Sequence, residues 1–89
     1  MRSERIPIVN KLGLHARASA KLVELARKFQ CTVTFSKDHD AVDGKSILGL
    51  LMLAAAYGET IELKTHGEDE EEAAQAIRDL FQRKFDENE

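Results

Sequence analysis

Residues 13–29, with the sequence GLHARASAKLVELARKF, run from a glycine-containing loop into an amphipathic helix. From residue 16 to residue 29 the chain favours helix, because its apolar side chains recur at spacings of three and four. This apolar stripe consists of Ala18, Leu22, Leu25 and Phe29. The pattern therefore places His15 at the point where the loop becomes the helix.

A histidine and an arginine at a helix N-terminus suit the binding of an anion. The first N–H groups of a helix have no partner within it, and the helix dipole adds partial positive charge there. His15 could carry a phosphoryl group on a ring nitrogen, while Arg17 supports the phosphate oxygens. The alternative is that His15 only caps or precedes the helix and that Arg17 is a solvated surface charge. The pentapeptide 13–17 alone does not decide between them.

Length and composition predict one domain, residues 1–89, with a modest core. A hydrophobic fraction of 43% argues against disorder. We expect a cytoplasmic protein, since the sequence has no basic, apolar leader and no apolar run long enough to cross a bilayer. The single cysteine, Cys31, fits a buried strand position. His39 and His66 lack metal-ligand spacing, so we expect surface histidines, no metal and no cofactor.

Charge is distributed unevenly along the chain. Residues 1–30 hold seven Lys or Arg against two Asp or Glu, which gives +5, whereas residues 31–89 hold six against fourteen, which gives −8. His15 lies in the basic part, where positive charge would steer an acidic partner or an anionic ligand. A solvated surface without a partner is the alternative.

Four short strands are expected. Residues 3–9 form the first. Because proline cannot donate to the ladder, Pro7 indicates that this strand lies at a sheet edge or points its missing N–H outwards. Residues 31–36 alternate apolar and polar side chains, and residues 41–43 should pair back on them as a hairpin. Residues 61–66 alternate in the same way and form the last strand.

Ser46 is well placed as the N-cap of a short helix. The following residues, 47–53, are apolar on nearly every side, so one sheet face cannot bury all of them. If Leu50 and Leu53 face the core, an exposed apolar patch remains, of the kind that marks docking surfaces. The alternative is that a loop covers it. The patch consists of Ile47, Leu48 and Leu51.

The last helix is expected over residues 69–84. Acidic residues 68–72 suit the positive end of its dipole, and Asp69 with Glu72 is typical of a capping box. Its buried stripe should consist of Ala73, Ala76, Ile77, Leu80 and Phe81. The order βαββαβα predicts the α+β class, an open-faced sandwich in which three helices cover one face of a four-stranded antiparallel sheet.

The motifs Gly13-Leu14-His15-Ala16-Arg17 and Gly44-Lys45-Ser46-Ile47, in a chain of this size and element order, resemble the HPr family. These proteins are histidine-containing phosphocarriers of the bacterial phosphoenolpyruvate-dependent phosphotransferase system. The resemblance covers essentially the whole chain. It implies a phosphoryl carrier and not an enzyme: His15 accepts a phosphoryl group from phospho-enzyme I and passes it to a IIA-type protein, and Arg17 supports the phosphate.

The resemblance also implies roles for residues of the second helix. It implies that enzyme I and the IIA-type protein both contact Ile47, Leu48, Leu51 and Met52. Ser46 matches the serine that an ATP-dependent HPr kinase/phosphorylase phosphorylates in many members. Two negative charges beside a docking patch would repel an acidic partner.

In one place the sequence departs from the family pattern, which has proline after the arginine where this chain has Ala18. Alanine restores an N–H donor and removes some rigidity, so we expect a retained site with an altered phosphohistidine lifetime. Residues 10–13, 50–53 and 85–87 are similar to the nitrogen-related branch, NPr, which passes phosphate to a regulatory IIA protein. Residues 44–46 are more typical of kinase-regulated members. The sequence favours the nitrogen-type branch over sugar uptake.

Three other functions fit the sequence less well. A catalytic enzyme would need a second acid or base or a metal set placed with His15, and the sequence offers neither. An RNA-binding sheet needs exposed aromatic residues, whereas the outward positions of the second strand are Thr32, Thr34 and Ser36. The remaining alternative is a regulatory interaction module of the same fold that has lost phosphotransfer. We therefore expect a monomeric carrier that binds neither nucleic acid nor membrane.

Overall fold

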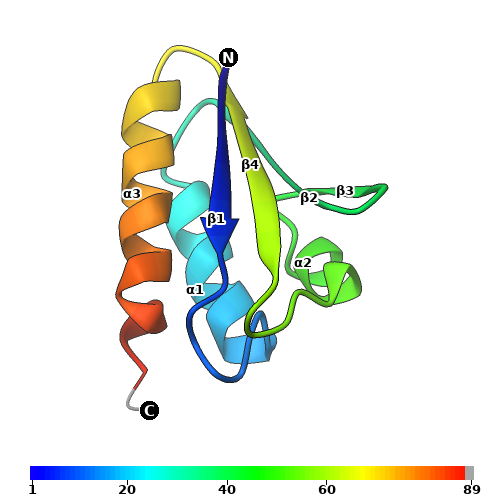
Figure 1. Cartoon of the computed structure of the whole chain (residues 1–89). Coiled ribbons are helices and arrows are strands. Elements are labelled where there is room, and N and C mark those ends of the chain that lie inside the picture. The colour runs from blue at the N-terminus through cyan, green and yellow to red at the C-terminus, as the bar shows by residue number, and fades with distance from the viewer. Residues whose placement is uncertain (88–89) are drawn as a thin grey trace.

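The computed structural model describes residues 1–87 of the chain. Its elements follow the predicted order βαββαβα, with one further 3-10 turn at the end (Figure 1). Their bounds are β1 (Arg2–Pro7), α1 (Ala16–Ala26), β2 (Thr32–Lys37), β3 (Asp40–Asp43), α2 (Ile47–Leu53), β4 (Thr60–His66), α3 (Glu70–Gln82) and η1 (Lys84–Asp86).

The four strands form one sheet in the order β1-β4-β2-β3, and every neighbouring pair is antiparallel. β1 is an edge strand, as Pro7 predicted, because only β4 pairs with it. β2 pairs with β3 through the predicted hairpin, in which Lys37 lies opposite Asp40. The order brings the first and last strands, β1 and β4, together in the sheet.

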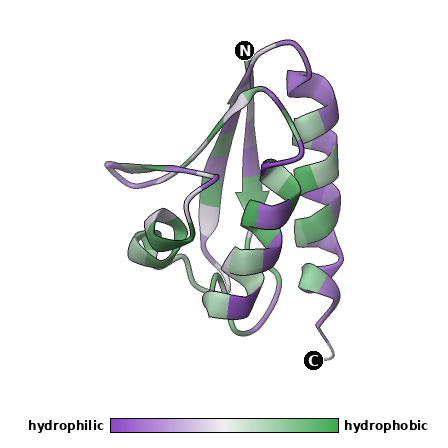
Figure 2. Ribbon diagram, turned by 180° about the vertical axis from the view of Figure 1, so that it is seen from behind, coloured by the Kyte–Doolittle hydropathy of each residue, from purple (hydrophilic) through white to green (hydrophobic). Residues whose placement is uncertain are grey.

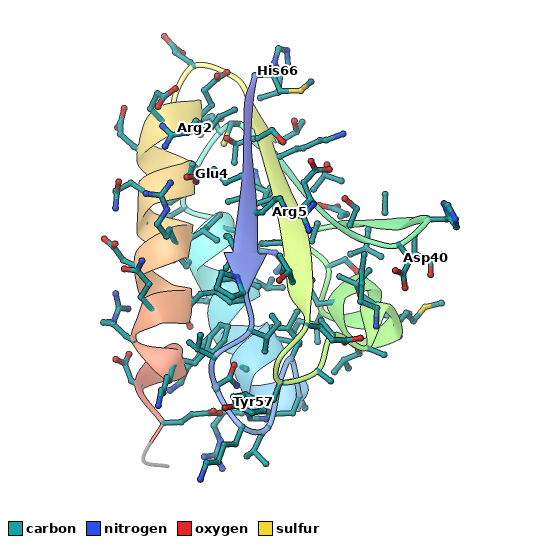
Figure 3. All side chains as sticks on the ribbon, viewed as in Figure 1. Arg2, Glu4, Arg5, Asp40, Tyr57 and His66 are labelled. Atoms are coloured by element: carbon teal, nitrogen blue, oxygen red, sulfur yellow. The ribbon has the colours of Figure 1, made fainter. Side chains whose placement is uncertain are left out.

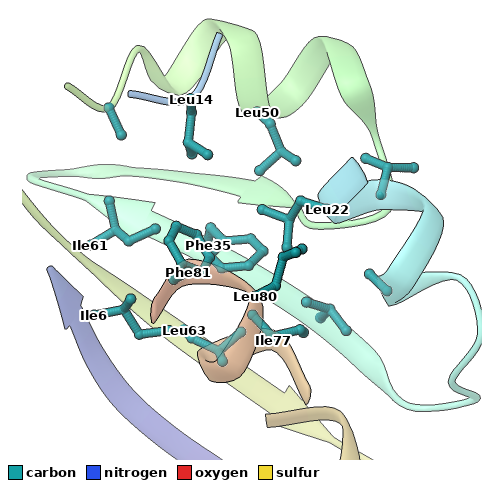
Figure 4. Packing of buried hydrophobic residues seen from close by; sticks show 14 of the residues in the cluster. Ile6, Leu14, Leu22, Phe35, Leu50, Ile61, Leu63, Ile77, Leu80 and Phe81 are labelled. Atoms are coloured by element: carbon teal, nitrogen blue, oxygen red, sulfur yellow. The ribbon is translucent and has the colours of Figure 1, made fainter. Parts of the chain in front are cut away.

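The helices lie on one face of the sheet, which confirms the open-faced sandwich. In Figure 1 the strands lie in front of α1, and the view from behind in Figure 2 brings the helices forward. Phe35 of β2 and Phe81 of α3 meet at the centre of the core, with ring centroids 6.1 Å apart (Figure 4). Leu22 of α1 and Leu50 of α2 are fully buried in the same cluster. Side chains from all three helices therefore fill a single apolar layer against the sheet.

α1 is shorter than the predicted span of residues 16–29. It ends at Ala26, and residues 27–29 form a turn with bonds of the i→i−3 type, such as Phe29 N–H to Ala26 O at 3.2 Å. Val23 and Ala26 are buried, whereas Leu25 and Phe29 are only partly so. The buried face of α1 therefore ends with Val23 and Ala26 in place of the predicted Leu25 and Phe29.

The predicted capping box at the start of α3 is wrong. Asp69 occupies the N-cap, but its side chain makes no capping hydrogen bond. Its carboxylate instead accepts the backbone N–H groups of Gln30 and Cys31, both at 2.9 Å. α3 itself spans Glu70–Gln82, and Ala74 is buried in place of Ala76. Asp69 therefore joins the start of α3 to the segment that leads into β2.

Cys31 is buried, as predicted, but it lies immediately before β2 and not within the strand. Burial, followed by a hydrogen bond with Asp69, raises the pKa of the Cys31 thiol. A thiol with a raised pKa is a weak nucleophile, so this cysteine acts as a packing residue. Within residues 1–87, no helix combines the length and the apolar character needed to span a membrane.

Candidate functional site

His15 is the N-cap residue of α1, as predicted. Its backbone is extended, with φ −75° and ψ 178°, and its carbonyl accepts the N–H of Ser19 at 2.9 Å. The imidazole makes no capping hydrogen bond, and 26% of the side chain is exposed. The backbone of His15 therefore begins the helix while the ring is left for other contacts.

The loop before His15 is fixed by Asn10 and Gly13. Asn10 is fully buried, and its Nδ2 donates to the carbonyl of Gly13 at 2.8 Å. Gly13 has φ +65°, and a Cβ placed there would lie 2.6 Å from the carbonyl oxygen of Ala55. The next residue, Leu14, is buried and donates its N–H to that same carbonyl at 3.0 Å. Close backbone contact with residue 55 thus requires glycine and fixes the chain immediately before His15.

The first turn of α1 supplies unpartnered backbone donors beside the histidine. The helical bonds begin with Ser19 N–H, so the N–H groups of residues 16, 17 and 18 have no acceptor within the helix. Ser19 is buried, and its hydroxyl donates back to the carbonyl of Leu14 at 3.2 Å. The guanidinium of Arg17 is exposed, and no described residue forms a hydrogen bond or ion pair with it. An anion held here would meet both backbone N–H groups and a cation.

A carboxylate from the end of the chain contacts the histidine. Glu87 Oε2 meets Nε2 of His15, and Glu87 Oε1 accepts Nδ2 of Asn10 at 3.2 Å. Only 8% of the Glu87 side chain is exposed. Sequence reasoning gave neither Asn10 nor Glu87 a role at the site, because 77 positions separate them along the chain and no local pattern joins them.

The apolar patch of α2 lies beside this site. Leu50 and Leu53 face the core as predicted, and no loop within residues 1–87 covers the remaining apolar residues. Figure 2 shows α2 as hydrophobic along most of its ribbon. The exposed residues of α2 are Ile47 at 41%, Leu48 at 67%, Leu51 at 39% and Met52 at 73%. The bond from Leu14 N–H to Ala55 O ties the end of this helix to the residue before His15.

Two further large apolar residues outside α2 are exposed, and the sequence had not singled them out. Leu12 belongs to the loop before His15, and Tyr57 belongs to the loop after α2; they are 68% and 60% exposed. Figure 3 shows Tyr57 at the same end of the molecule as the loop that leads into α1. In the sequence, only their apolar character within turn-like segments could have indicated that these residues are exposed.

Ser46 caps α2 as predicted. Its Oγ accepts the N–H of Gly49 at 3.0 Å, and its own backbone is extended. The residue before it is fixed to α1, because Lys45 Nζ donates to the carbonyl of Phe29 at 2.7 Å while Arg27 donates to the Lys45 carbonyl at 3.1 Å. The hydroxyl is half-buried at a helix N-terminus, next to the apolar patch.

Comparison with known proteins decides the family. The family model described as "PTS HPr component phosphorylation site" matches residues 2–83. Phosphocarrier protein HPr of Neisseria meningitidis serogroup A is 52% identical over 89 residues, covering 100% of both chains. Phosphocarrier protein NPr of Shewanella violacea is 45% identical over 83 residues, covering 93% of this chain and 91% of the other. The solved structure of HPr-C-His from Thermoanaerobacter tengcongensis has a TM-score of 0.96 and 42% identity, covering 100% of both chains. This chain belongs to the HPr family.

HPr proteins are phosphocarriers of the phosphotransferase system and not enzymes, and the surface described above suits a protein that is itself the substrate of its partners. His15, Arg17 and the apolar patch lie on the outside of the molecule. A hollow of about 490 Å³ between β1 and α3 is lined by Ile6, Pro7, Phe81 and their neighbours, and none of these site residues lines it.

Proposed function

We propose that His15 accepts a phosphoryl group from phospho-enzyme I and passes it to a IIA-type protein. The observation that supports this most directly is the position of His15, at the N-cap of α1 with its ring not used for capping. The ring is partly exposed, so the histidine of a partner can approach it. We propose further that the carrier acts as a monomer in the cytoplasm, which a single species in sedimentation at working concentrations would support.

The transfer needs only the imidazole, the helix N-terminus and Arg17. A neutral ring nitrogen of His15 attacks phosphorus in line, while the partner's N–P bond breaks and its electron pair remains on the partner's ring. The N–H groups of residues 16–18 and the Arg17 guanidinium hold the phosphate oxygens. Because residue 18 is alanine, its N–H is present, and we expect it to alter the phosphohistidine lifetime relative to family members with proline.

The first test is to incubate the protein with phosphoenolpyruvate and enzyme I and to follow its intact mass beside a His15→Ala control. We expect one added phosphate that mild acid removes and that the control lacks. No added phosphate, with enzyme I shown active on another carrier, would favour the alternative of a regulatory module that no longer transfers phosphate.

Arg17→Ala should slow transfer about tenfold, because one charged hydrogen bond to the phosphate is lost. Lys28→Ala is the matched control, since Lys28 is an exposed cation beyond the end of α1. If Arg17→Ala transferred phosphate at an unchanged rate, Arg17 would have no part in the transfer.

We propose that both partners dock on Ile47, Leu48, Leu51 and Met52 of α2. Their exposure and their position beside His15 support this. Leu48→Glu should raise the KM for enzyme I at least about tenfold with an unchanged melting temperature, because a charge would be buried on docking. Ala41→Glu, on exposed β3, is the matched control. Normal transfer by Leu48→Glu would show that enzyme I does not dock on this surface of α2.

Ser46 is proposed as a regulatory phosphorylation site for an HPr kinase/phosphorylase. Its place at the start of α2 supports this, because a helix N-terminus accommodates added negative charge while the adjacent patch would lose affinity for an acidic partner. Ser46→Asp should therefore fold normally and accept phosphate from enzyme I more slowly than Ser46→Asn. Equal rates in the two variants would argue against this control.

We propose that the acceptor is the regulatory IIA protein of the nitrogen branch. Two of the segments that are similar to NPr, residues 10–13 and 85–87, supply the groups that surround His15. This supports an acceptor that differs from the IIA proteins of sugar uptake. The test is competition: the phosphorylated protein is offered equal amounts of a nitrogen-type and a sugar-type IIA protein. Faster transfer to the sugar-type protein would assign the chain to sugar uptake.

A further inference from the structure

We propose that Met52 is a site of reversible oxidation, and that conversion of its thioether to the sulfoxide weakens the docking of enzyme I on α2. This inference rests on the proposed function, in which the partners contact the exposed apolar residues of α2. It deepens that function by adding a response of the docking surface to peroxides.

The oxidisable side chains of the chain lie in different environments. The sequence holds one cysteine, two methionines and no tryptophan. Cys31 is only 2% exposed, and burial also raises the pKa of its thiol, so little reactive thiolate is available to a peroxide. Met1 and Met52 are 75% and 73% exposed. A peroxide in solution therefore reaches both thioethers, whereas the thiol is shielded.

Of the two methionines, only Met52 belongs to the apolar patch of α2. It follows Leu48 by four residues, so the two side chains lie on the same side of the helix, and they are the two most exposed residues of the patch. Met1 lies before β1, where its amino group pairs with Glu70 at 3.0 Å. Leu53, next to Met52, is buried in the core. Oxidation of Met52 thus changes the docking surface and leaves the buried side of α2 intact.

Oxidation gives this apolar surface a hydrogen-bond acceptor. The sulfur lone pair of Met52 attacks one oxygen of hydrogen peroxide, and the S–O bond forms as the O–O bond breaks. The sulfur loses two electrons, and the released hydroxide takes the proton from the transferred oxygen and becomes water. A methionine sulfoxide reductase reverses the change, because two thiols are oxidised to a disulfide while the oxygen leaves as water.

The sulfoxide should weaken docking because its oxygen must give up water when a partner covers α2. The side chains of Ile47, Leu48 and Leu51 carry no donor that could replace that water. The thioether, in contrast, is apolar and adapts its shape to a partner. We therefore expect oxidation to raise the KM for phospho-enzyme I at least about fivefold. The kcat should not change, because the groups around His15 are unaltered.

The test treats the purified protein with hydrogen peroxide until peptide mass spectrometry finds one added oxygen atom on Met1 and on Met52. We expect the rise in KM at an unchanged melting temperature, and its reversal by methionine sulfoxide reductases A and B. Dithiothreitol alone should not reverse it, which separates Met52 from any oxidation of Cys31. Met52→Leu is the matched control: it still oxidises at Met1, and its own KM should be the same before and after treatment.

Three results would overturn the proposal. They are an unoxidised Met52 at a dose that oxidises Met1, an unchanged KM once Met52 is oxidised, and an equal rise of KM in treated Met52→Leu. If the untreated protein takes no phosphate from enzyme I, the proposed function of His15 fails instead. Calorimetric titration of enzyme I then decides the role of Met52, since weaker binding of the oxidised protein supports it and equal binding overturns it.

Discussion

At the scale of single residues, two left-handed backbone positions fix the surroundings of His15. Gly13 has φ +65° in the loop before the histidine, and Ala54 has φ +54° at the end of α2. Glycine adopts this conformation without a steric penalty, whereas alanine does not. The site thus has the expected residue at one of these positions and a strained residue at the other.

Gly13→Ala should lower the free energy of unfolding by about 2–3 kcal/mol, because it adds a contact of 2.6 Å with the Ala55 carbonyl to the backbone strain. Gly58→Ala is the matched control: its φ is +89°, but nothing lies within 4 Å of the added Cβ. Urea denaturation measures both. Equal losses in the two variants would mean that the contact with Ala55 has no cost of its own.

Ala54→Gly should have the opposite effect and raise the free energy of unfolding by about 1 kcal/mol, since it relieves the left-handed strain at an exposed position. Ala56→Gly, two residues on and without a positive φ, should lower it by about 0.5 kcal/mol through the greater freedom of the unfolded chain. A loss of stability in Ala54→Gly would show that the strain at this cap is negligible.

At the scale of elements, the two helix caps show what a local pattern can predict. Ser46 caps α2 as its sequence indicates, because its partner, Gly49, lies three residues away. Asp69 has the same local pattern, yet it accepts the N–H groups of Gln30 and Cys31, which are 39 and 38 positions away. A pattern in the sequence predicts a hydrogen bond only when no partner from another element competes for the same oxygen atoms.

Asp69 should therefore stabilise the fold in a pH-dependent way. The N–H of Gln30, foremost, and that of Cys31 lower the pKa of Asp69. A carboxyl group with a lowered pKa contributes stability above its unfolded-state pKa of about 3.9, and this contribution is lost as the pH falls through the lower folded-state pKa. Asp69→Asn should be less stable at pH 7 and lose less stability between pH 5 and pH 2. Glu72→Gln, the exposed partner in the predicted capping box, should keep the wild-type pH profile.

At the scale of the whole molecule, periodicity predicted the element order and the exposed patch, because both depend on burial along one element. Pro7 predicted the edge position of β1, because that position depends on a single missing N–H group. Glu87 and Asn10 were not assigned to the site, because their role depends on how the two ends of the chain meet. The same holds for Tyr57, whose exposure depends on how its loop packs. Sequence thus predicts the groups that one element presents, and tertiary structure adds those brought from elsewhere.

Phe85 anchors the end of the chain that carries Glu87. Lys84, Phe85 and Asp86 all have φ between +55° and +60°, a conformation that the sequence of these residues does not favour. Phe85 is fully buried, and its ring packs edge-on against Phe81 with centroids 4.9 Å apart. Burial of this ring offsets the backbone cost of the three residues.

Phe85→Ala should therefore have two linked effects. It should lower the free energy of unfolding by about 3–5 kcal/mol, as expected when a buried phenylalanine is removed. It should also release Glu87, so that the hydrogen-bonded Nε2–H NMR signal of His15 is lost while α1 stays folded. Phe29→Ala, at a partly buried ring beyond the end of α1, should lower stability by less and leave that signal unchanged. If Phe85→Ala kept the His15 signal, Glu87 would be held by Asn10 and Lys21 without the aromatic anchor, and the strained turn at residues 84–86 would need another source of stability.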